Sequence, residues 1–147
     1  MDSKKAILLI EDNPSDIELT RRALAKARIA NHLAVVEDGQ EALDYLFATG
    51  SYLGRDASEM PALVLLDLKL PRISGLDLLQ QIRADARTRR LSVVVLTSSK
   101  EDLDVTKAYD LGANSYIVKP VDFAQFQKTV EQVGLYWLLT NQVPPNR

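Results

Sequence analysis

The sequence predicts an α/β protein in which a five-stranded parallel sheet is covered by helices on both faces. Two observations carry this prediction. Short, almost wholly apolar runs recur along the chain, and each is followed by a segment with helical periodicity and helix-capping residues. Apolar runs of about four to eight residues are typical of strands buried on both faces, and strands that alternate with helices indicate a doubly wound sheet.

Five strands and five helices alternate along the chain. The strands are expected at about residues 5–11, 33–37, 62–67, 92–97 and 115–118. The helices are expected at about residues 13–28, 40–48, 76–84, 101–111 and 122–139. Residues 49–61 are expected to form a loop that is long for this fold class and has room for a helical extension.

Local signals mark several helix ends. Pro14 suits an early position of the first helix, and Ser15 and Glu18 have the spacing of a capping box. Gly112 suits the residue that follows the fourth helix, and Asp122 suits the cap of the fifth. These signals agree with the strand and helix alternation inferred from the apolar runs.

The strand order follows from crossover handedness and from charge. Right-handed crossovers leave few orders open, and the flavodoxin-like order 2-1-3-4-5 makes the acidic ends of the first and third strands neighbours. The 147 residues, 46% of them hydrophobic, are enough for one domain with a sizeable core. We expect a single domain over residues 1–147, with a core at about 5–139 and a C-terminal tail at 140–147.

Four of the apolar runs end on residues suited to metal or phosphoryl chemistry. The first ends on Glu11 and Asp12, the third on Asp67, the fourth on Thr97 and the fifth on Lys119. The carboxyl ends of parallel strands lie along one edge of the sheet, where ligands bind, so these side chains are expected in one pocket. Three neighbouring carboxylates repel one another unless a cation neutralises them, and ligation by oxygen alone suits Mg²⁺ or Mn²⁺.

The rest of the pocket fits a phosphoryl ligand. The Lys119 ammonium and the Thr97 hydroxyl can stabilise the charge of a transferring phosphoryl group. Asp67 is the expected nucleophile, because a carboxylate can attack phosphorus to give an aspartyl phosphate. A single strand-end Asp, Lys or Thr is usually a cap or a solvated residue. The combination at four strand ends favours a functional site instead.

The motifs at these strand ends resemble the receiver domain of two-component response regulators over nearly the whole chain, from Ile7 to about Leu139. Thirty residues separate Asp67 from Thr97 and twenty-two separate Thr97 from Lys119, which also matches that family. The matching motifs are Ile10-Glu11-Asp12-Asn13, Leu66-Asp67-Leu68-Lys69-Leu70-Pro71 with Ser74-Gly75, Thr97-Ser98 and Lys119-Pro120.

The resemblance implies how the pocket holds its ligands. Asp67 matches the phosphoacceptor, and the phosphoryl donor would be a phosphohistidine on a partner sensor kinase. Asp12 and Asp67 match direct ligands of Mg²⁺, and Glu11 matches a ligand acting through water. The backbone carbonyl of Lys69 matches the third protein ligand of the metal.

The resemblance also implies a conformational switch. Lys119 matches the lysine that pairs with the phosphoryl group, and its bond to Pro120 is expected to be cis. Thr97 matches the hydroxyl that responds to phosphorylation, and Tyr116 matches the aromatic that turns inward afterwards. An aromatic in an edge strand usually only packs, so the role of Tyr116 depends on the family position alone.

Other features suggest a subgroup and its partners. Residues 48–61, 98–102 and the aromatic tail resemble the small regulators paired with bacterial and cyanobacterial phytochromes. No output domain is expected after the last helix, so the signal is expected to leave through protein contacts or onward phosphotransfer to a downstream protein. The apolar last helix predicts a homodimer through helix four, strand five and helix five, or through the tail. His32 is expected at the surface or the core edge.

Composition excludes several classes of function. Lys and Arg number 18 and Asp and Glu 20, so the net charge of −2 offers no strongly basic surface for nucleic acid. The arginines of residues 83–90 are expected on a solvated helix end. The chain has no cysteine, which excludes disulfides and metal sites with thiolate ligands. No apolar run approaches the length of a membrane span. Because residues 1–5 run straight into the first expected strand, we expect no signal peptide and a cytoplasmic location.

Three alternatives remain. A haloacid-dehalogenase-like phosphatase would need a second Asp at position 69, where this chain has Lys69. An FMN-binding module would need a glycine-rich phosphate loop after the first strand, where the chain is acidic. A degenerate receiver would bind partners without phosphorylation, yet all five key residues are present. The expected activity is therefore phosphoryl transfer to Asp67 itself, without turnover of an external substrate.

Overall fold

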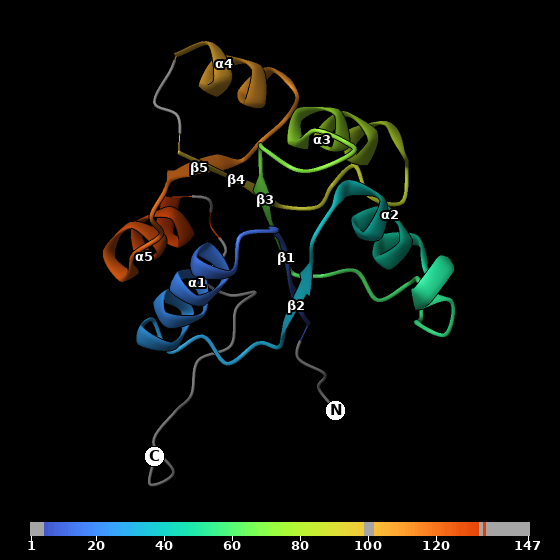
Figure 1. Ribbon diagram of the computed structural model, residues 1–147, viewed down its shortest axis with the longest axis horizontal. Helices are drawn as coiled ribbons and strands as arrows, with labels where there is room; N and C mark the ends of the chain where they lie inside the picture. The colour runs from blue at the N-terminus through green and yellow to red at the C-terminus, as the bar shows by residue number, and fades with distance from the viewer. Residues whose placement is uncertain (1–4, 99–101, 133, 135–147) are drawn as a thin grey trace, which may run out of the picture.

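The computed structural model describes residues 5–98, 102–132 and 134, and it contains the predicted sheet. Five parallel strands lie in the order β2-β1-β3-β4-β5, as expected (Figure 1). Their bounds are Ile7–Ile10 for β1, Leu33–Val36 for β2, Leu63–Asp67 for β3, Val93–Thr97 for β4 and Ser115–Val118 for β5. The three central strands are wholly buried, which explains their unbroken apolar sequences.

Helices cover both faces of the sheet (Figure 1), and two apolar layers fill the space between. On one face α1 and α5 pack side by side, and α2, α3 and α4 cover the other. The helices are α1 (Pro14–Lys26), α2 (Gly39–Phe47), α3 (Gly75–Ala84), α4 (Asp102–Asp110) and α5 (Phe123–Gln132). Of the predicted end of the last helix and the tail, residues 133 and 135–147 lie outside the described part of the chain.

The start of α1 differs from the prediction. Asn13, not Ser15, caps the helix: its side chain accepts hydrogen bonds from the backbone amides of Ser15 at 2.9 Å and Asp16 at 3.1 Å. Pro14 then occupies the first helical position, which places Ser15 inside the helix and rules out its capping box with Glu18. The expected caps at Asp122 and Gly112 are confirmed by a 2.8 Å bond from the Gln125 amide and by a φ of +93°.

The connection from α2 to β3 contains the expected helical extension, the short 3₁₀ helix η1 (Gly50–Tyr52). Arg55 fastens this connection to α2. Its guanidinium donates to the carbonyl oxygens of Tyr45 at 2.7 Å, Leu46 at 3.2 Å and Glu59 at 2.8 Å. It also lies 4.3 Å from the centroid of the Tyr45 ring. The long loop is therefore a fixed part of the domain.

Arg83 corrects the expectation that residues 83–90 form only a solvated helix end. Its guanidinium donates to the carbonyl oxygens of Gly112 at 2.6 and 3.0 Å, Leu91 at 2.7 Å and Arg89 at 2.9 Å. Arg83 thus joins the end of α3 to the turns before β4 and β5. Arg89 and Arg90 are exposed, as predicted. The expectation went wrong because the carbonyl partners at Gly112 are distant in sequence.

Gly75 begins α3 directly against the end of β3. Its amide donates to the Leu68 carbonyl at 2.9 Å. A Cβ atom at this position would lie 2.3 Å from the Asp67 carbonyl oxygen and 2.6 Å from Leu68 Cα. Only glycine therefore permits this close approach of α3 to the strand that ends on Asp67.

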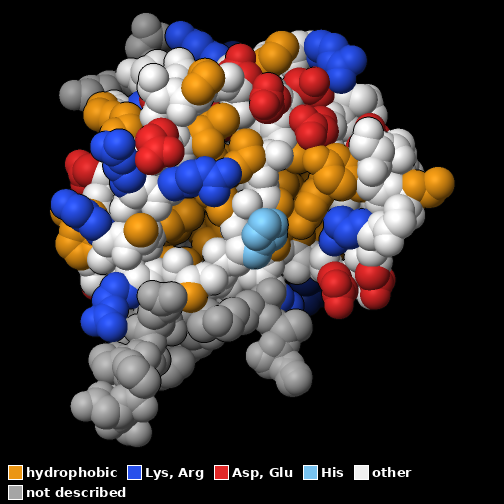
Figure 2. All heavy atoms as spheres, turned by 60° about the horizontal axis from the view of Figure 1, so that its bottom comes forward, with side chains coloured by type: hydrophobic (Ala, Val, Ile, Leu, Met, Phe, Trp, Pro, Cys, Tyr) orange, Lys and Arg blue, Asp and Glu red, His pale blue; other side chains and the backbone are white. Residues whose placement is uncertain are grey.

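Two further expectations concern the surface. His32 is exposed just before β2, and a histidine side chain is visible at the surface in Figure 2. In the part of the chain that the structure describes, no helix has the length and apolarity needed to cross a membrane.

Candidate functional site

The sheet register brings the predicted acidic residues together. Ile10 of β1 lies beside Leu66 of β3, so Glu11, Asp12 and Asp67 follow at the same edge of two neighbouring strands. One carboxylate oxygen from each of these three residues lies within 4.8 Å of the others. Glu11 is fully buried and Asp67 is 4% exposed, whereas Asp12 is exposed to solvent. The group therefore has a buried inner side and an open outer side.

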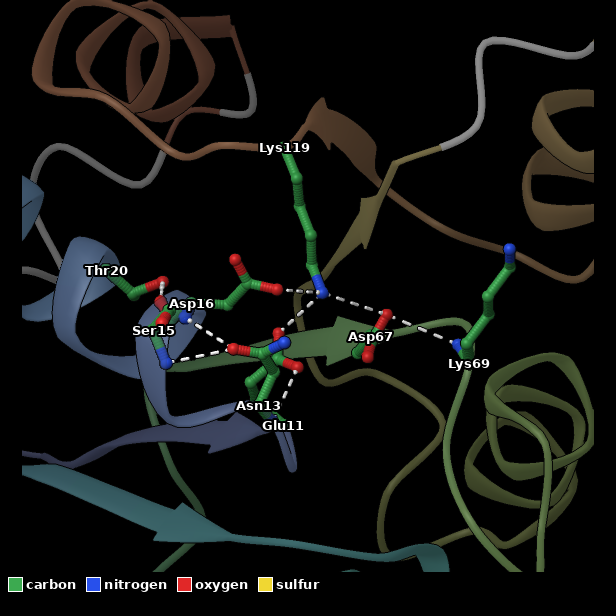
Figure 3. A network of polar contacts seen from close by, with 8 residues as sticks. All are labelled: Glu11, Asn13, Ser15, Asp16, Thr20, Asp67, Lys69 and Lys119. Atoms are coloured by element: carbon green, nitrogen blue, oxygen red, sulfur yellow. Dashed lines mark hydrogen bonds and ion pairs between the residues drawn. The ribbon is translucent and has the colours of Figure 1, made fainter.

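Lys119 reaches this acidic group from the end of β5. Thr97 of β4 pairs with Val118, and the Lys119 amide donates to the Thr97 carbonyl at 2.8 Å. The Lys119 Nζ atom lies 2.8 Å from Glu11 Oε1, 2.9 Å from Asp16 Oδ2 and 3.3 Å from Asp67 Oδ1. Figure 3 shows the ammonium between the carboxylates of Glu11, Asp16 and Asp67. The predicted meeting of Glu11, Asp12, Asp67 and Lys119 is thus present in the structure.

Burial and charge shift the proton affinities in this site. The pKa of Glu11 is raised to about 7, because burial and the Asp67 charge, which raise it, outweigh the opposing effect of Lys119. Burial alone would lower the pKa of Lys119, but its contacts with Glu11 and Asp16 and the charge of Asp67 outweigh that effect. The pKa of Lys119 is therefore raised, and its ammonium stays charged at neutral pH.

Thr97 and Lys69 flank Asp67. Thr97 ends β4 and is buried, one position beyond Leu96, which pairs with Asp67. The Lys69 amide donates to Asp67 Oδ1 at 3.2 Å, while its side chain extends away from Asp67 (Figure 3). The Lys119–Pro120 peptide bond is cis, as the resemblance implied.

Tyr116 is not part of this group of charges. It is half-buried on the face of the sheet that α4 covers, where its ring meets that of Tyr109 edge to face, with centroids 5.9 Å apart. The structure therefore shows Tyr116 in a packed position against α4. Its inward movement stays a prediction.

The sequence reasoning missed Asp16. This residue lies in the first turn of α1, and its side chain accepts a 2.9 Å hydrogen bond from Lys119, which is 103 residues away in sequence. An acidic residue in a first helical turn is common because it suits the helix dipole, so the sequence carries no signal for this contact. The contact arises because α1 starts beside the end of β5.

The donor set fits a divalent cation bound by oxygen. Glu11, Asp12 and Asp67 supply carboxylates only, which suits Mg²⁺ or Mn²⁺. Glu11 Oε1 is buried, and within the described part of the chain it accepts no hydrogen bond, although it forms an ion pair with the Lys119 ammonium 2.8 Å away. A buried carboxylate oxygen of this kind requires positive charge nearby.

Fold and site together define a doubly wound α/β protein with an acidic pocket and a buried lysine at the carboxyl edge of its sheet. Residues 7–131 match the family model of the response regulator receiver domain, and the chain belongs to this family. It is therefore a response regulator protein of the phosphorylation-based signalling type, as the sequence motifs implied.

Three relatives cover nearly the whole chain. The probable methanogenesis regulatory protein FilR2 of Methanothrix harundinacea is 41% identical over 138 residues, which are 94% of this chain and 86% of the relative. The bacteriophytochrome response regulator RtBRR is 47% identical with a TM-score of 0.87, over 97% of this chain and 86% of that chain. Response regulator Rcp1 of Synechocystis is 35% identical over 140 residues, 95% of this chain and 93% of the relative. Its Mn²⁺-bound structure has a TM-score of 0.75 and 34% identity, over 95% of this chain and 99% of that one.

Proposed function

We propose that this protein accepts a phosphoryl group on Asp67 from a partner histidine kinase and signals through the resulting change in protein contacts. The observation that carries this proposal is the pocket itself. Three carboxylate oxygens lie within 4.8 Å of one another, and the Lys119 ammonium is 3.3 Å from the Asp67 carboxylate. This arrangement can hold a cation and a phosphoryl group side by side.

Asp12 and Asp67 would hold Mg²⁺ directly, with Glu11 acting through water and the Lys69 backbone carbonyl as a further ligand. Mn²⁺ has the same ligand preference, and the Mn²⁺-bound form of Rcp1 supports this choice of metal. When bound, the cation would neutralise charge on the phosphoryl oxygens. The exposed side of Asp12 leaves the site open to solvent, where a small ion can enter.

The reaction is a displacement at phosphorus. A carboxylate oxygen of Asp67 forms a bond to the phosphorus atom while the bond from phosphorus to the donor nitrogen or oxygen breaks and its electron pair leaves with the donor. The Lys119 ammonium offsets the charge of the phosphoryl group, and Thr97 contributes its hydroxyl. The pocket holds no second Asp at position 69 to act as a general acid, so we propose no turnover of an external substrate.

Signalling would proceed through Thr97, Tyr116 and the surface of α4, β5 and α5. Two of the exposed large apolar side chains among the described residues, Tyr109 and Phe123, belong to α4 and α5. They support the proposal of a homodimer through this surface. The alternative contact through the tail concerns residues outside the described part of the chain. A downstream protein or phosphotransfer protein would read the same surface.

The relatives support a more specific partner. RtBRR is named a bacteriophytochrome response regulator, and another solved relative, RcpA, is a cyanobacterial phytochrome response regulator. We propose that the kinase of this chain is likewise a phytochrome and that the exchange takes place in the cytoplasm. We further propose that residues 1–147 act as one receiver domain. Purified phytochrome kinase labelled with phosphate should transfer the label to the wild type and leave Asp67→Asn unlabelled.

One experiment separates the proposal from its alternatives. The protein is incubated with Mg²⁺ and acetyl phosphate, and its intact mass is measured. A single acid-stable, base-labile phosphoryl adduct is expected in the wild type and in Asp77→Asn, which changes an exposed carboxylate on α3, but not in Asp67→Asn. Steady release of phosphate from several phosphate esters would instead favour a phosphatase. Absence of any adduct would favour a degenerate receiver that only binds partners.

A further inference from the structure

Among the residues that the structure describes, the Asp16 carboxylate is joined to the pocket by its ion pair with Lys119. The Lys119 ammonium donates a hydrogen bond to Asp16 Oδ2 at 2.9 Å, whereas its distance to Asp67 Oδ1 is 3.3 Å. We propose that Asp16 is a positioning residue, which holds the Lys119 ammonium and competes for it with the phosphoryl group on Asp67. This inference rests on the proposed function, because it requires Lys119 to pair with that phosphoryl group.

The backbone of Asp16 is fixed before any ligand arrives. Its amide donates to Asn13 Oδ1 at 3.1 Å, and its carbonyl accepts from the Thr20 hydroxyl at 2.9 Å. The side chain is only 23% exposed and points from α1 towards the end of β5 (Figure 3). A carboxylate on a capped helix end of this kind loses little conformational freedom when it binds the ammonium.

Asp16 does not belong to the acidic group that fits the cation. The carboxylates with oxygens within 4.8 Å of one another are those of Glu11, Asp12 and Asp67 among the described residues. Asp16 and Asp67 approach the Lys119 ammonium from opposite sides (Figure 3). Lys119 is therefore held between Asp67, the proposed phosphoacceptor, and Asp16, which does not accept the phosphoryl group.

Phosphorylation changes the balance between these two partners. A phosphoryl group on Asp67 adds negative charge and three acceptor oxygens on one side of Lys119. The ammonium then has to share its hydrogen bonds between the phosphoryl group and Asp16. The Asp16 carboxylate thus favours the unphosphorylated arrangement, and removing its charge favours the phosphorylated one.

A purely structural role for Asp16 makes a different prediction. A carboxylate in the first turn stabilises a helix through the dipole, whatever it contacts. Asp77 occupies the matching position of α3, where its amide donates to the capping Ser74 hydroxyl at 3.1 Å, and it is exposed. Asp77→Asn therefore removes the same helix-end charge without touching Lys119, and it serves as the matched control.

The test measures the affinity of each variant for beryllofluoride, a mimic of the phosphoryl group. The titration is carried out at saturating Mg²⁺ and is monitored through amide NMR signals. Asp16→Asn removes one charge from a partly buried ion pair. We expect this variant to bind beryllofluoride with a Kd about three- to tenfold lower than that of the wild type. Asp16→Glu keeps the charge and should stay closer to the wild type, and Asp77→Asn should match the wild type. An unchanged or weaker affinity in Asp16→Asn, or an equal gain in Asp77→Asn, would overturn the proposal.

A double-variant comparison tests whether Asp16 acts through Lys119. The gain from Asp16→Asn should shrink or vanish in a Lys119→Met background, because the ammonium that transmits it is gone. A gain of the same size in both backgrounds would show that Asp16 acts directly on the phosphoryl group, and the proposal would fall. Failure of the wild type to bind beryllofluoride at all would overturn the proposed function and this inference with it, so the two failures are distinguishable.

Discussion

Replacing Lys119 with methionine should destabilise the metal-free protein in a way that depends on pH. The Lys119 side chain is 12% exposed and lies against carboxylates whose side chains are 0% (Glu11) and 6% (Asp67) exposed. Removing one partner of a buried ion pair costs about 3–5 kcal/mol, because a charge is left without compensation. At pH 8 we therefore expect a loss of about 3 kcal/mol, towards the low end because solvent reaches Asp16.

The loss should become smaller in acid. Glu11 already has a pKa of about 7, and without the neighbouring ammonium its pKa rises further. At pH 5.5 Glu11 is then protonated, one of the repelling charges disappears, and we expect a loss of about 1 kcal/mol. Saturating Mg²⁺ should restore most of the stability at pH 8, because the cation supplies the missing positive charge.

The assay is urea unfolding followed by far-UV circular dichroism, at both pH values, with chelator or with Mg²⁺. Lys128→Met on the exposed side of α5 is the control and should stay within about 0.5 kcal/mol of the wild type. A loss in Lys119→Met that is below about 1 kcal/mol at pH 8, or that Mg²⁺ leaves unchanged, would refute the argument that Lys119 neutralises a buried acidic pocket.

Three further predictions follow from the packing and charge of the domain. The pKa of Glu11 is raised in the folded state, so its contribution to stability is complete below the unfolded value of 4.5 and is lost as the pH rises through about 7. Urea midpoints of the metal-free wild type should therefore fall over this range relative to Glu11→Gln, and parallel pH profiles would contradict this. Arg83→Met should lower the free energy of unfolding in urea by about 2 kcal/mol, because a charged donor to three carbonyl groups is lost. A decrease below about 0.5 kcal/mol would show that water replaces these hydrogen bonds. Gly75→Ala should lose at least about 3 kcal/mol because its Cβ collides with backbone, whereas Gly54→Ala, with nothing within 4 Å, should be neutral in thermal unfolding.

Most of the fold could be predicted because each strand is short and almost wholly apolar. A run such as residues 62–66 is typical of a strand buried on both faces, and the alternation with helices then leaves few topologies. The start of α1 could not be predicted to the residue, because Asn13 and Ser15 are both good caps and only backbone geometry chooses between them. The bonds of Arg83 were missed for another reason, since Gly112 is 29 residues away.

The candidate site likewise contains residues that could be predicted from the sequence and residues that could not. Glu11, Asp12, Asp67 and Lys119 could be predicted together because each lies at or just beyond the end of a strand, and parallel strands end at one edge. Asp16 could not, because it lies on a helix whose start meets the end of β5 only in the folded chain. Which of the three carboxylates is buried could not be predicted either. The burial of Glu11 and the exposure of Asp12, adjacent in sequence, depend on how the chain turns after β1.

The close approach of Gly75 to β3 leaves no side chain as a spacer between the start of α3 and the strand end that carries Asp67. The backbone of Asp67 and Leu68 therefore has little room to shift towards α3. We expect a rearrangement at Asp67 to be accommodated instead across the sheet, at Thr97 in the last position of β4 and at Lys119 just beyond β5.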